Sequence, residues 1–295
     1  MSFTFPREAL FLIAGPCVLE SDDLNVRVGE HLARLAERIP GGIVYKASFD
    51  KANRSNAGAA RGPGLDEGLA ALDRVRRATG LPLLTDVHLP EQCAPAAEVV
   101  DVLQIPAFLC RQTDLLLAAG ATGKPVNIKK GQWMHPEGMK GAVDKVRVAQ
   151  GDERREKGST MPRTKPAADA DASRIPSPVS RIAVTERGSF FGYGDLVVDM
   201  RGFSRMREAC NAPVIFDGTH SVQRPGMGDG GASGGAREHI AALTRAAVAA
   251  GADGLFLETH PDPDRAPSDG PNMLPLAGLD AVVTRAVELW QMCRQ

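Results

Sequence analysis

Long apolar runs are absent from the 295-residue sequence, and none approaches the roughly 20 residues that a membrane-spanning helix needs. The opening stretch, residues 1–16, has a short apolar run but neither a basic segment nor a small-residue cleavage site. We therefore expect this stretch to form a first strand rather than a secretion signal, in a cytoplasmic protein that has no membrane partner.

An excess of charge and a disulfide framework are also missing. The 35 basic and 36 acidic side chains leave a net charge of −1, which gives no reason to expect nucleic acid or an acidic membrane as a partner. An odd number of scattered cysteines in a chain of this length does not indicate disulfides and suits a reducing compartment. The five are Cys17, Cys93, Cys110, Cys210 and Cys293.

A dinucleotide-binding fingerprint is the third absence. The glycines of RPGMGDGGASGGAR, residues 224–237, do not stand between a strand and a helix, because the preceding apolar run has already ended at His220. This segment is typical of a flexible loop that leads into a helix.

The sequence does contain eight short, continuous apolar runs. Such runs, rather than alternating ones, are typical of parallel strands that are buried on both faces. The predicted strands are 10–17, 42–49, 82–88, 102–108, 125–131, 181–188, 213–220 and 254–260.

Segments with helical spacing separate these runs, most clearly at 24–39, 65–80 and 237–251, and the last two end at a glycine. Strand and helix repeated eight times predict an α/β fold, a single-domain (β/α)8 TIM barrel over residues 1–295. A doubly wound open sheet is the alternative. One segment, 151–179, is rich in Pro, Ser, Asp, Arg and Lys, and we expect a disordered, catalytically neutral insertion there.

Nearly every run ends in polar or charged residues. Strands that merely reach the surface would end in mixed polar types, whereas these ends carry many carboxylates, lysines and histidines. In barrel enzymes the active site lies at the carboxyl ends of the strands, so we expect one polar site there. The residues at these ends include Cys17, Glu20, Lys46, Ser48, Asp86, His88, Gln104, Lys129, Glu186, Arg187, Asp217, His220, Glu258 and His260.

A cluster of cations follows the second run. Lysine, arginine and short polar donors suit phosphate and carboxylate groups, although such a cluster can also be a solvated loop. Lys129, Lys130 and Arg187 end other strands, and we expect them to face the same mouth, which favours anion binding. The cluster comprises Lys46, Ser48, Lys51, Asn53, Arg54 and Ser55.

Four further side chains, Cys17, His220, Glu258 and Asp269, form a mixed set that suits Zn2+, Fe2+, Mn2+ or a similar divalent ion. A lone cysteine is usually a small buried hydrophobe, and a lone histidine is more often hydrogen-bonded than ligating. In a closed barrel, however, strands 7, 8 and 1 are neighbours, which brings three of the four together.

Long motifs then resemble one family. They are AGPCVLES (14–21), YKASFDKANRS (45–55), RGPGLDEGL (61–69), TDVH (85–88), QIPAFLCRQTDLL (104–116), KPVNIKKGQWM (124–134), ERGSFFGYGDLVVDMR (186–201), FDGTHSVQRPG (216–226) and ETHPDPDRAPSDGPNMLPL (258–276). Together they resemble the 3-deoxy-D-manno-octulosonate-8-phosphate synthases. The resemblance covers nearly the whole chain except 151–179.

The resemblance implies a transferase that condenses phosphoenolpyruvate with D-arabinose 5-phosphate, in lipopolysaccharide inner-core biosynthesis, and a homotetramer. The related 3-deoxy-D-arabino-heptulosonate-7-phosphate synthases, which use erythrose 4-phosphate, typically have KPRTS where this chain has KANRS at 51–55. They remain the alternative, together with a non-catalytic barrel that binds sugar phosphates.

The resemblance also implies residue roles. Lys46, Lys51, Gln104, Lys129 and Arg187 correspond to the phosphoenolpyruvate site, and Asn53, Arg54 and Ser55 to the arabinose 5-phosphate site. Cys17 at the end of the first strand indicates the metal-dependent branch, with His220, Glu258 and Asp269 as the other ligands of a divalent ion (Zn2+, Fe2+, Mn2+ or Co2+). The expected catalytic residues are Lys46 as proton donor, Asp86 as a hydroxyl contact, and His220. Asn56 and Ala59–Ala60 depart from the family pattern.

Overall fold

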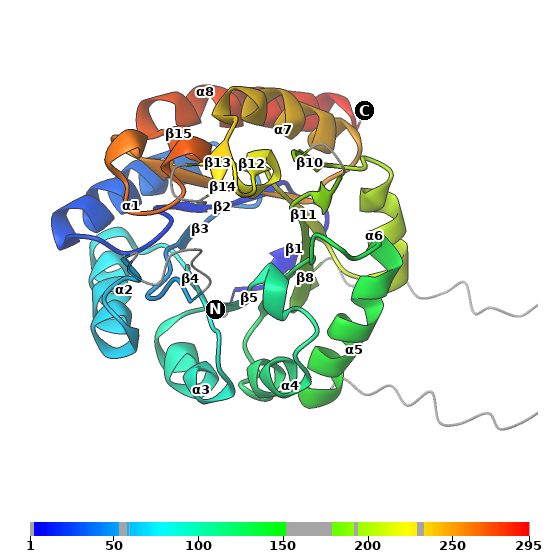
Figure 1. The fold of residues 1–295 in the computed structure, drawn as a ribbon, viewed down its shortest axis with the longest axis horizontal. Coiled ribbons are helices and arrows are strands. Elements are labelled where there is room, and N and C mark those ends of the chain that lie inside the picture. Colours follow the sequence, from blue (N-terminus) through cyan, green and yellow to red (C-terminus); the bar gives the residue numbers. More distant parts are fainter. Residues whose placement is uncertain are drawn as a thin grey trace, which may run out of the picture.

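Parallel strands close into a barrel within a ring of helices (Figure 1). The computed structural model describes residues 3–52, 58, 60–151, 179–191, 194–228 and 233–294. Within these ranges the eight barrel strands follow the order β2-β3-β4-β5-β6-β8-β11-β14, and β14 pairs with both β11 and β2. That last pairing closes the sheet, so the barrel is confirmed and an open sheet is excluded.

Each predicted apolar run contains one barrel strand. The strands are β2 (Phe11–Gly15), β3 (Ile43–Lys46), β4 (Leu83–Asp86), β5 (Val102–Ile105), β6 (Val126–Lys129), β8 (Ile182–Glu186), β11 (Val214–Asp217) and β14 (Gly254–His260). Continuous apolar sequence therefore predicted the strands correctly, because both faces of each strand are buried.

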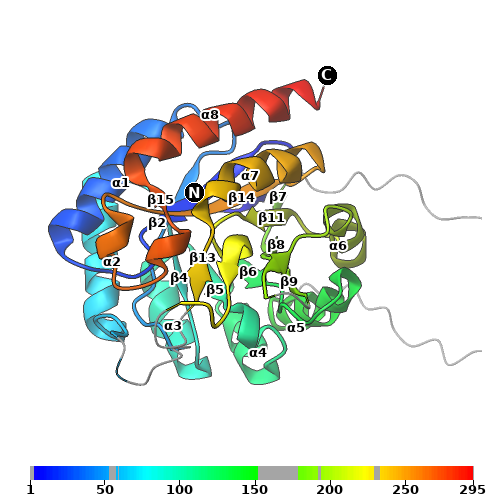
Figure 2. The ribbon, with the colours of Figure 1, turned by 45° about the horizontal axis from the view of Figure 1, so that its top comes forward.

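Helices follow the strands and cover the outside of the barrel (Figure 2). Glycines in the left-handed conformation end or follow two of them, Gly80 (φ 69°) after α2 and Gly251 (φ 93°) after α7. The predicted helix 24–39 begins earlier, after the cap Ser21, and residues 237–239 form a 3-10 turn before α7. The helices are α1 (Asp22–Ala36), α2 (Leu65–Thr79), α3 (Pro90–Val99), α4 (Thr113–Ala121), α5 (Lys140–Ala149), α6 (Gly202–Cys210), α7 (Ile240–Ala249) and α8 (Leu276–Met292).

Alternation along the strands creates two apolar cores. One lies between the barrel and the helices, and the other fills the barrel interior. Two residues beyond an interior apolar side chain, on the same face of the strand, stands a polar one. The pairs are Val44 and Lys46, Leu84 and Asp86, Val102 and Gln104, Ala183 and Thr185, Ile215 and Asp217, and Phe256 and Glu258. A polar layer therefore lies on an apolar floor at the carboxyl end of the barrel.

A short ribbon covers the opposite, amino-terminal end. Strand β1 (Phe5–Pro6) pairs with β7 (Val179–Ser180), and the Phe5 ring lies 5.8 Å from that of Phe11, the first residue of β2. Of the predicted insertion 151–179, residues 152–178 lie outside the described residues. Its described flanks, the end of α5 and β7, lie on the amino-terminal side, away from the polar layer.

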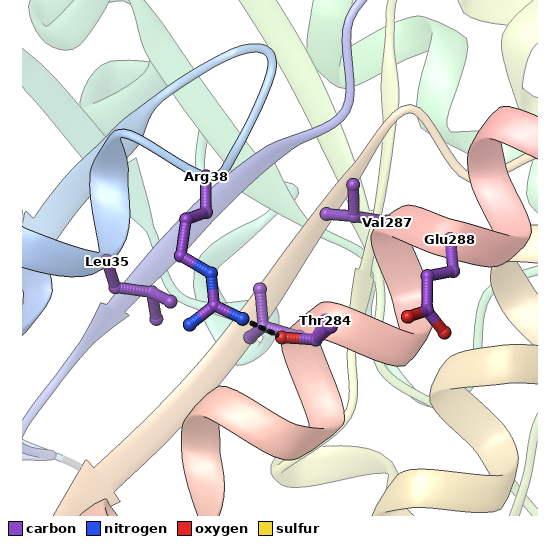
Figure 3. Close-up of a pocket in the computed structure, with 6 residues that line it drawn as sticks. Leu35, Arg38, Thr284, Val287 and Glu288 are labelled. Atoms are coloured by element: carbon purple, nitrogen blue, oxygen red, sulfur yellow. Dashed lines mark hydrogen bonds between the residues drawn. The ribbon is translucent and has the colours of Figure 1, made fainter.

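The outer wall of the barrel carries a small pocket between α1 and α8 (Figure 3). None of the predicted site residues lines this pocket. Its lining consists of Leu35, Arg38, Val283, Thr284, Val287 and Glu288.

Among the described residues, no helix is long and apolar enough to span a membrane.

Candidate active site

A directed chain of hydrogen bonds crosses half of the polar layer. Thr185 Oγ1 donates to Asn127 Oδ1 (2.7 Å), and Asn127 Nδ2 donates to Gln104 Oε1 (2.8 Å). Gln104 Nε2 then donates to Asp86 Oδ1 at 2.6 Å. Both ends of each amide are thereby engaged, so the chain fixes the orientation of Gln104 and holds the carboxylate of Asp86.

Lys46 lies at the end of β3, where burial leaves only 1% of it exposed. Its Nζ atom donates to Glu258 Oε1 (2.7 Å) and to the Cys17 carbonyl oxygen (3.0 Å). The strand ends can approach closely here because Gly15 has no side chain: a Cβ at that position would lie 2.1 Å from the Lys46 carbonyl oxygen. The glycine of the GPC motif therefore allows Cys17 and Lys46 to meet.

Asp86 is held ionised in this layer. Ser48 donates a hydrogen bond to its Oδ2 atom, and Lys46 Nζ lies 3.6 Å from the same oxygen. Burial alone would raise the pKa of Asp86, but the ammonium groups of Lys46, Lys51 and Lys129 outweigh it and hold the pKa below its usual range. The carboxylate is therefore available as an acceptor for a substrate hydroxyl.

Lys129 and His220 meet at a third carboxylate, that of Asp217. Its Oδ2 atom accepts from Lys129 Nζ (2.8 Å) and from His220 Nδ1 (2.8 Å). The ring of Phe256 lies under Lys129, 3.6 Å from the Nζ atom to the ring centroid. Burial lowers the pKa of Lys129, and Asp217 partly offsets that effect. The contacts with Asp217 and Phe256 fix the position of the amino group.

Arg187 follows β8 and is only 5% exposed. Its Nη2 atom donates to Gln223 Oε1, and Gln223 Nε2 donates to Asp269 Oδ1 at 2.8 Å. The buried Nη1 atom has no hydrogen-bond partner among the described residues. An unpaired buried guanidinium nitrogen is costly, so its position suits an anionic ligand.

Three of the four candidate metal ligands form a close group among the described residues, and His220, the fourth, lies beside it. The ligand atoms of Cys17, Glu258 and Asp269 all lie within 4.8 Å of one another. His220 Nε2 lies 3.6 Å from Glu258 Oε2, and that carboxylate oxygen is buried without a hydrogen-bond partner among the described residues. The set consists of a thiol, an imidazole nitrogen and two carboxylates, and one carboxylate oxygen is buried without a hydrogen-bond partner among the described residues. Such a set fits a divalent cation.

The surroundings shift the pKa values of the thiol and of one carboxylate of this cluster in opposite directions. Burial first, and then the charge of Glu258, raise the pKa of Cys17, whose thiol donates to Asp269 Oδ2 at 3.1 Å. Burial would raise the pKa of Asp269, but His220 and Lys51 hold it below the usual range. A divalent cation at this position would take the place of the thiol proton.

Lys51 belongs to the same group of charges. Burial lowers the pKa of its ammonium, yet the acidic groups of Cys17 and Glu258 outweigh that effect and raise the pKa overall. Its backbone N–H donates to the Arg61 carbonyl oxygen (2.7 Å), and Arg61 forms two hydrogen bonds with the carboxylate of Asp50. Asn53, Arg54 and Ser55, together with Asn56 and Ala59, lie outside the described residues.

Two polar strand ends do not join the site. We expected Lys130 to face the mouth, but it points away from the axis, 3.5 Å from Glu186 Oε1 and 3.0 Å from Ser189 Oγ. Adjacent residues of a strand point to opposite faces, so Lys129 and Lys130 cannot both face the axis. His260 lies outside the barrel interior as well, with Nε2 3.1 Å from Glu20 Oε1.

Four residues that position other side chains of the site were not predicted from the sequence: Asn127, Thr185, Asp217 and Gln223. Asn127 and Thr185 carried a signal, because a polar residue inside a buried apolar run must have a partner. Asp217 was noted only as a strand end. Gln223 follows the 3-10 turn η3 (His220–Val222), and no motif predicts which side chains it bridges.

The fold and the site together define a (β/α)8-barrel enzyme that gathers cations and candidate metal ligands at the carboxyl ends of its strands. Residues 7–294 match the DAHP synthetase I family, to which the chain belongs.

Several curated relatives of the chain share one name. Proteins named "2-dehydro-3-deoxyphosphooctonate aldolase" from Rhodopseudomonas palustris (strain BisB5) and Verminephrobacter eiseniae are 52% and 51% identical to the chain. These alignments cover 95% and 96% of the chain, and 87% and 90% of the relatives. A protein of the same name from Nitratidesulfovibrio vulgaris (strain DP4) is 49% identical over 96% of the chain and 92% of its own length.

Proposed function

We propose that the chain condenses phosphoenolpyruvate with D-arabinose 5-phosphate and water, giving 3-deoxy-D-manno-octulosonate 8-phosphate and inorganic phosphate. The name and the near full-length coverage of relatives about 50% identical favour this reaction over the one that uses erythrose 4-phosphate. The structural observation that carries the proposal is the buried layer in which Lys46, Lys129 and Arg187 surround the barrel axis.

Phosphoenolpyruvate carries a phosphate and a carboxylate, and two of these cations suit it best. Arg187 offers an unpaired buried Nη1 atom, and Lys129 is fixed between Asp217 and the ring of Phe256. Fixed donors of this kind bind an anion without being reorganised, which also orients the methylene carbon for attack. Lys51 adds charge at the same mouth, and Asn53, Arg54 and Ser55 are proposed to bind the sugar phosphate.

The reaction forms a carbon–carbon bond between the methylene carbon and the aldehyde carbon. The aldehyde oxygen becomes an alkoxide that needs a proton, and Lys46 is the proposed donor, with Asp86 as acceptor for a substrate hydroxyl. Water adds at C2, and the C2–phosphate linkage breaks to leave a ketone and inorganic phosphate. Of the two protons that the water brings, one restores Lys46 and one leaves with the phosphate.

We also propose a divalent metal site made by Cys17, His220, Glu258 and Asp269. The cluster of ligand atoms and the unpaired Glu258 Oε2 atom support it. A bound Zn2+, Fe2+, Mn2+ or Co2+ ion would supply Lewis acidity for the carbonyl group or lower the pKa of a bound water.

An aldehyde assay with and without chelator tests both proposals. Phosphate release should be rapid with arabinose 5-phosphate and at least about tenfold slower with erythrose 4-phosphate, since a pocket built for one sugar loses binding energy with a shorter one. A chelator should abolish turnover, and Mn2+ or Co2+ should restore it. Preference for erythrose 4-phosphate would contradict the proposed substrate, and full activity in chelator would contradict the metal site.

A homotetramer and a cytoplasmic location complete the proposal, with the product entering the lipopolysaccharide inner core. Three large apolar side chains near the site are about half exposed: Phe108 (49%), Trp133 (47%) and Phe190 (50%). The rings of Phe108 and Trp133 lie 5.7 Å apart, and an exposed aromatic surface of this kind is typical of a subunit interface. Five free cysteines suit a reducing compartment.

A further inference from the structure

Gln223 bridges the two halves of the site. Its Oε1 atom accepts from Arg187 Nη2, while its Nε2 atom donates to Asp269 Oδ1 at 2.8 Å. The side chain belongs neither to the candidate ligands nor to the cations. Because an amide has one donating and one accepting end, Gln223 can satisfy the guanidinium and the carboxylate together only in this orientation.

Gln223 joins two residues of opposite charge, and each of them faces the site for a ligand whose charge is opposite to its own. Arg187 presents the unpaired Nη1 atom on the anion side, and Asp269 lies in the cluster with Cys17 and Glu258 on the cation side. Any shift of Arg187 toward an anion moves the donor that holds Gln223 Oε1, and the Nε2 end of the same amide in turn positions Asp269.

We infer that Gln223 is a positioning residue that couples occupancy of the anion site to occupancy of the metal site. The inference deepens the proposed function and rests on it. Coupling should be positive, because an anion neutralises the cations that repel a divalent ion. Linkage then requires that the metal raise the affinity for the anion by the same factor.

Titration with Co2+ measures this coupling without turnover. Cys17 is a candidate thiolate ligand, so Co2+ binding should produce a sulfur-to-metal absorption band, and the dissociation constant is measured with and without phosphoenolpyruvate. In the unmodified protein, phosphoenolpyruvate should tighten Co2+ binding by about fivefold or more, the lower end of typical coupling between sites.

Gln223→Met keeps the length of the side chain and removes both hydrogen bonds. The coupling factor should fall at least about threefold, leaving the through-space part of the attraction. Gln223→Glu keeps an acceptor for Arg187 but cannot donate to Asp269, so it should also lose coupling. This variant replaces Gln223→Met in the test if the Met variant does not fold. Arg224→Met is the matched control, because Arg224 is the neighbouring residue of β12 (Gln223–Arg224) and pairs with Asp195 at the surface.

The outcomes separate the inference from the proposed function. An unchanged coupling factor in the Gln223 variants overturns the inference, even if both affinities fall, because a purely structural role weakens each site without uncoupling them. Co2+ binding that phosphoenolpyruvate does not affect overturns it too. Absence of the Co2+ band in the unmodified protein contradicts the metal site itself.

Discussion

His220 turns its Nε2 atom toward Glu258 because its Nδ1 atom donates to the carboxylate of Asp217. A carboxylate only accepts, so it selects the imidazole form that carries its proton on Nδ1 and leaves Nε2 free for a metal. Asp217 also accepts from Lys129, and the cations around it hold its pKa below the usual range against the opposing effect of burial. One side chain thus orients a candidate ligand and a candidate anion-binding lysine.

Asp217→Asn should therefore lower metal affinity by about 10–100-fold, the usual cost of losing a partner that orients a ligand. The amide can face His220 with a donor, which favours the wrong imidazole form. Competition with a chromogenic chelator measures the affinity directly. Asp195→Asn, at an exposed carboxylate paired with Arg224, is the control and should bind metal normally. Equal affinities in the two variants would contradict this role of Asp217.

At the scale of elements, the two consecutive lysines at the end of strand β6, Lys129 and the residue that follows the strand, Lys130, lie in different environments. Lys129 faces the barrel axis, while Lys130 lies against Glu186, with side chains only 1% and 3% exposed. Glu186 has a raised pKa because of burial, which Lys130 partly offsets. The pair connects the end of β6 to the end of β8, just before Arg187.

Lys130→Met should destabilise the fold by about 3–5 kcal/mol, because it leaves a buried carboxylate without its cation. The loss of stability in this variant should shrink as pH falls, since protonated Glu186 needs no cation. A carboxyl group whose pKa is raised in the folded state stabilises the fold at low pH, and that contribution is lost as pH rises through the raised pKa. Urea unfolding at two pH values measures the effect, and Lys130→Met/Glu186→Gln should recover part of it. Lys140→Met, in an exposed pair with Asp144, should cost under about 0.5 kcal/mol. A loss equal to that of this control would contradict the buried-pair account.

What the sequence could predict follows from the same elements. The strands were predictable because all eight are buried on both faces. Closure of the barrel brings Cys17 and Glu258 together, and His220 Nε2 lies 3.6 Å from Glu258 Oε2. Asp269 lies in a loop, so closure of the barrel did not predict its position; it was proposed because its carboxylate suits the mixed ligand set, and the resemblance to a family supported it. The position of Lys130 was predicted wrongly, since strand-end position was considered without alternation. The bridge made by Gln223 depends on the exact path of a turn, which no local pattern specifies.

At the scale of the whole molecule, the barrel separates its two ends by function. The polar layer occupies the carboxyl end, while the amino end holds the β1–β7 ribbon and the described flanks of the insertion. Gln150 Nε2 donates to the Lys124 carbonyl oxygen just before β6, so the chain leaves the barrel wall at that end as well.

Deletion of residues 155–176 should consequently leave the turnover number and both Michaelis constants within about twofold, because loops at the amino face of such barrels do not contribute to catalysis. Steady-state kinetics measures the constants, and thermal unfolding verifies that the deleted protein is folded. A tenfold fall in turnover with an intact fold would contradict this prediction.

The hydrogen-bond chain from Thr185 through Asn127 and Gln104 to Asp86 has an evolutionary consequence. Thr185, Asn127 and Gln104 each donate to the next member around the barrel and Asp86 accepts at the end, so replacing one alone leaves a buried donor or acceptor unmatched. We expect the four positions to be inherited as a set, and compensating pairs to appear where one has changed. The interior of the barrel would then record ancestry more conservatively than exposed ion pairs of its helices such as Lys140–Asp144, whose loss costs little.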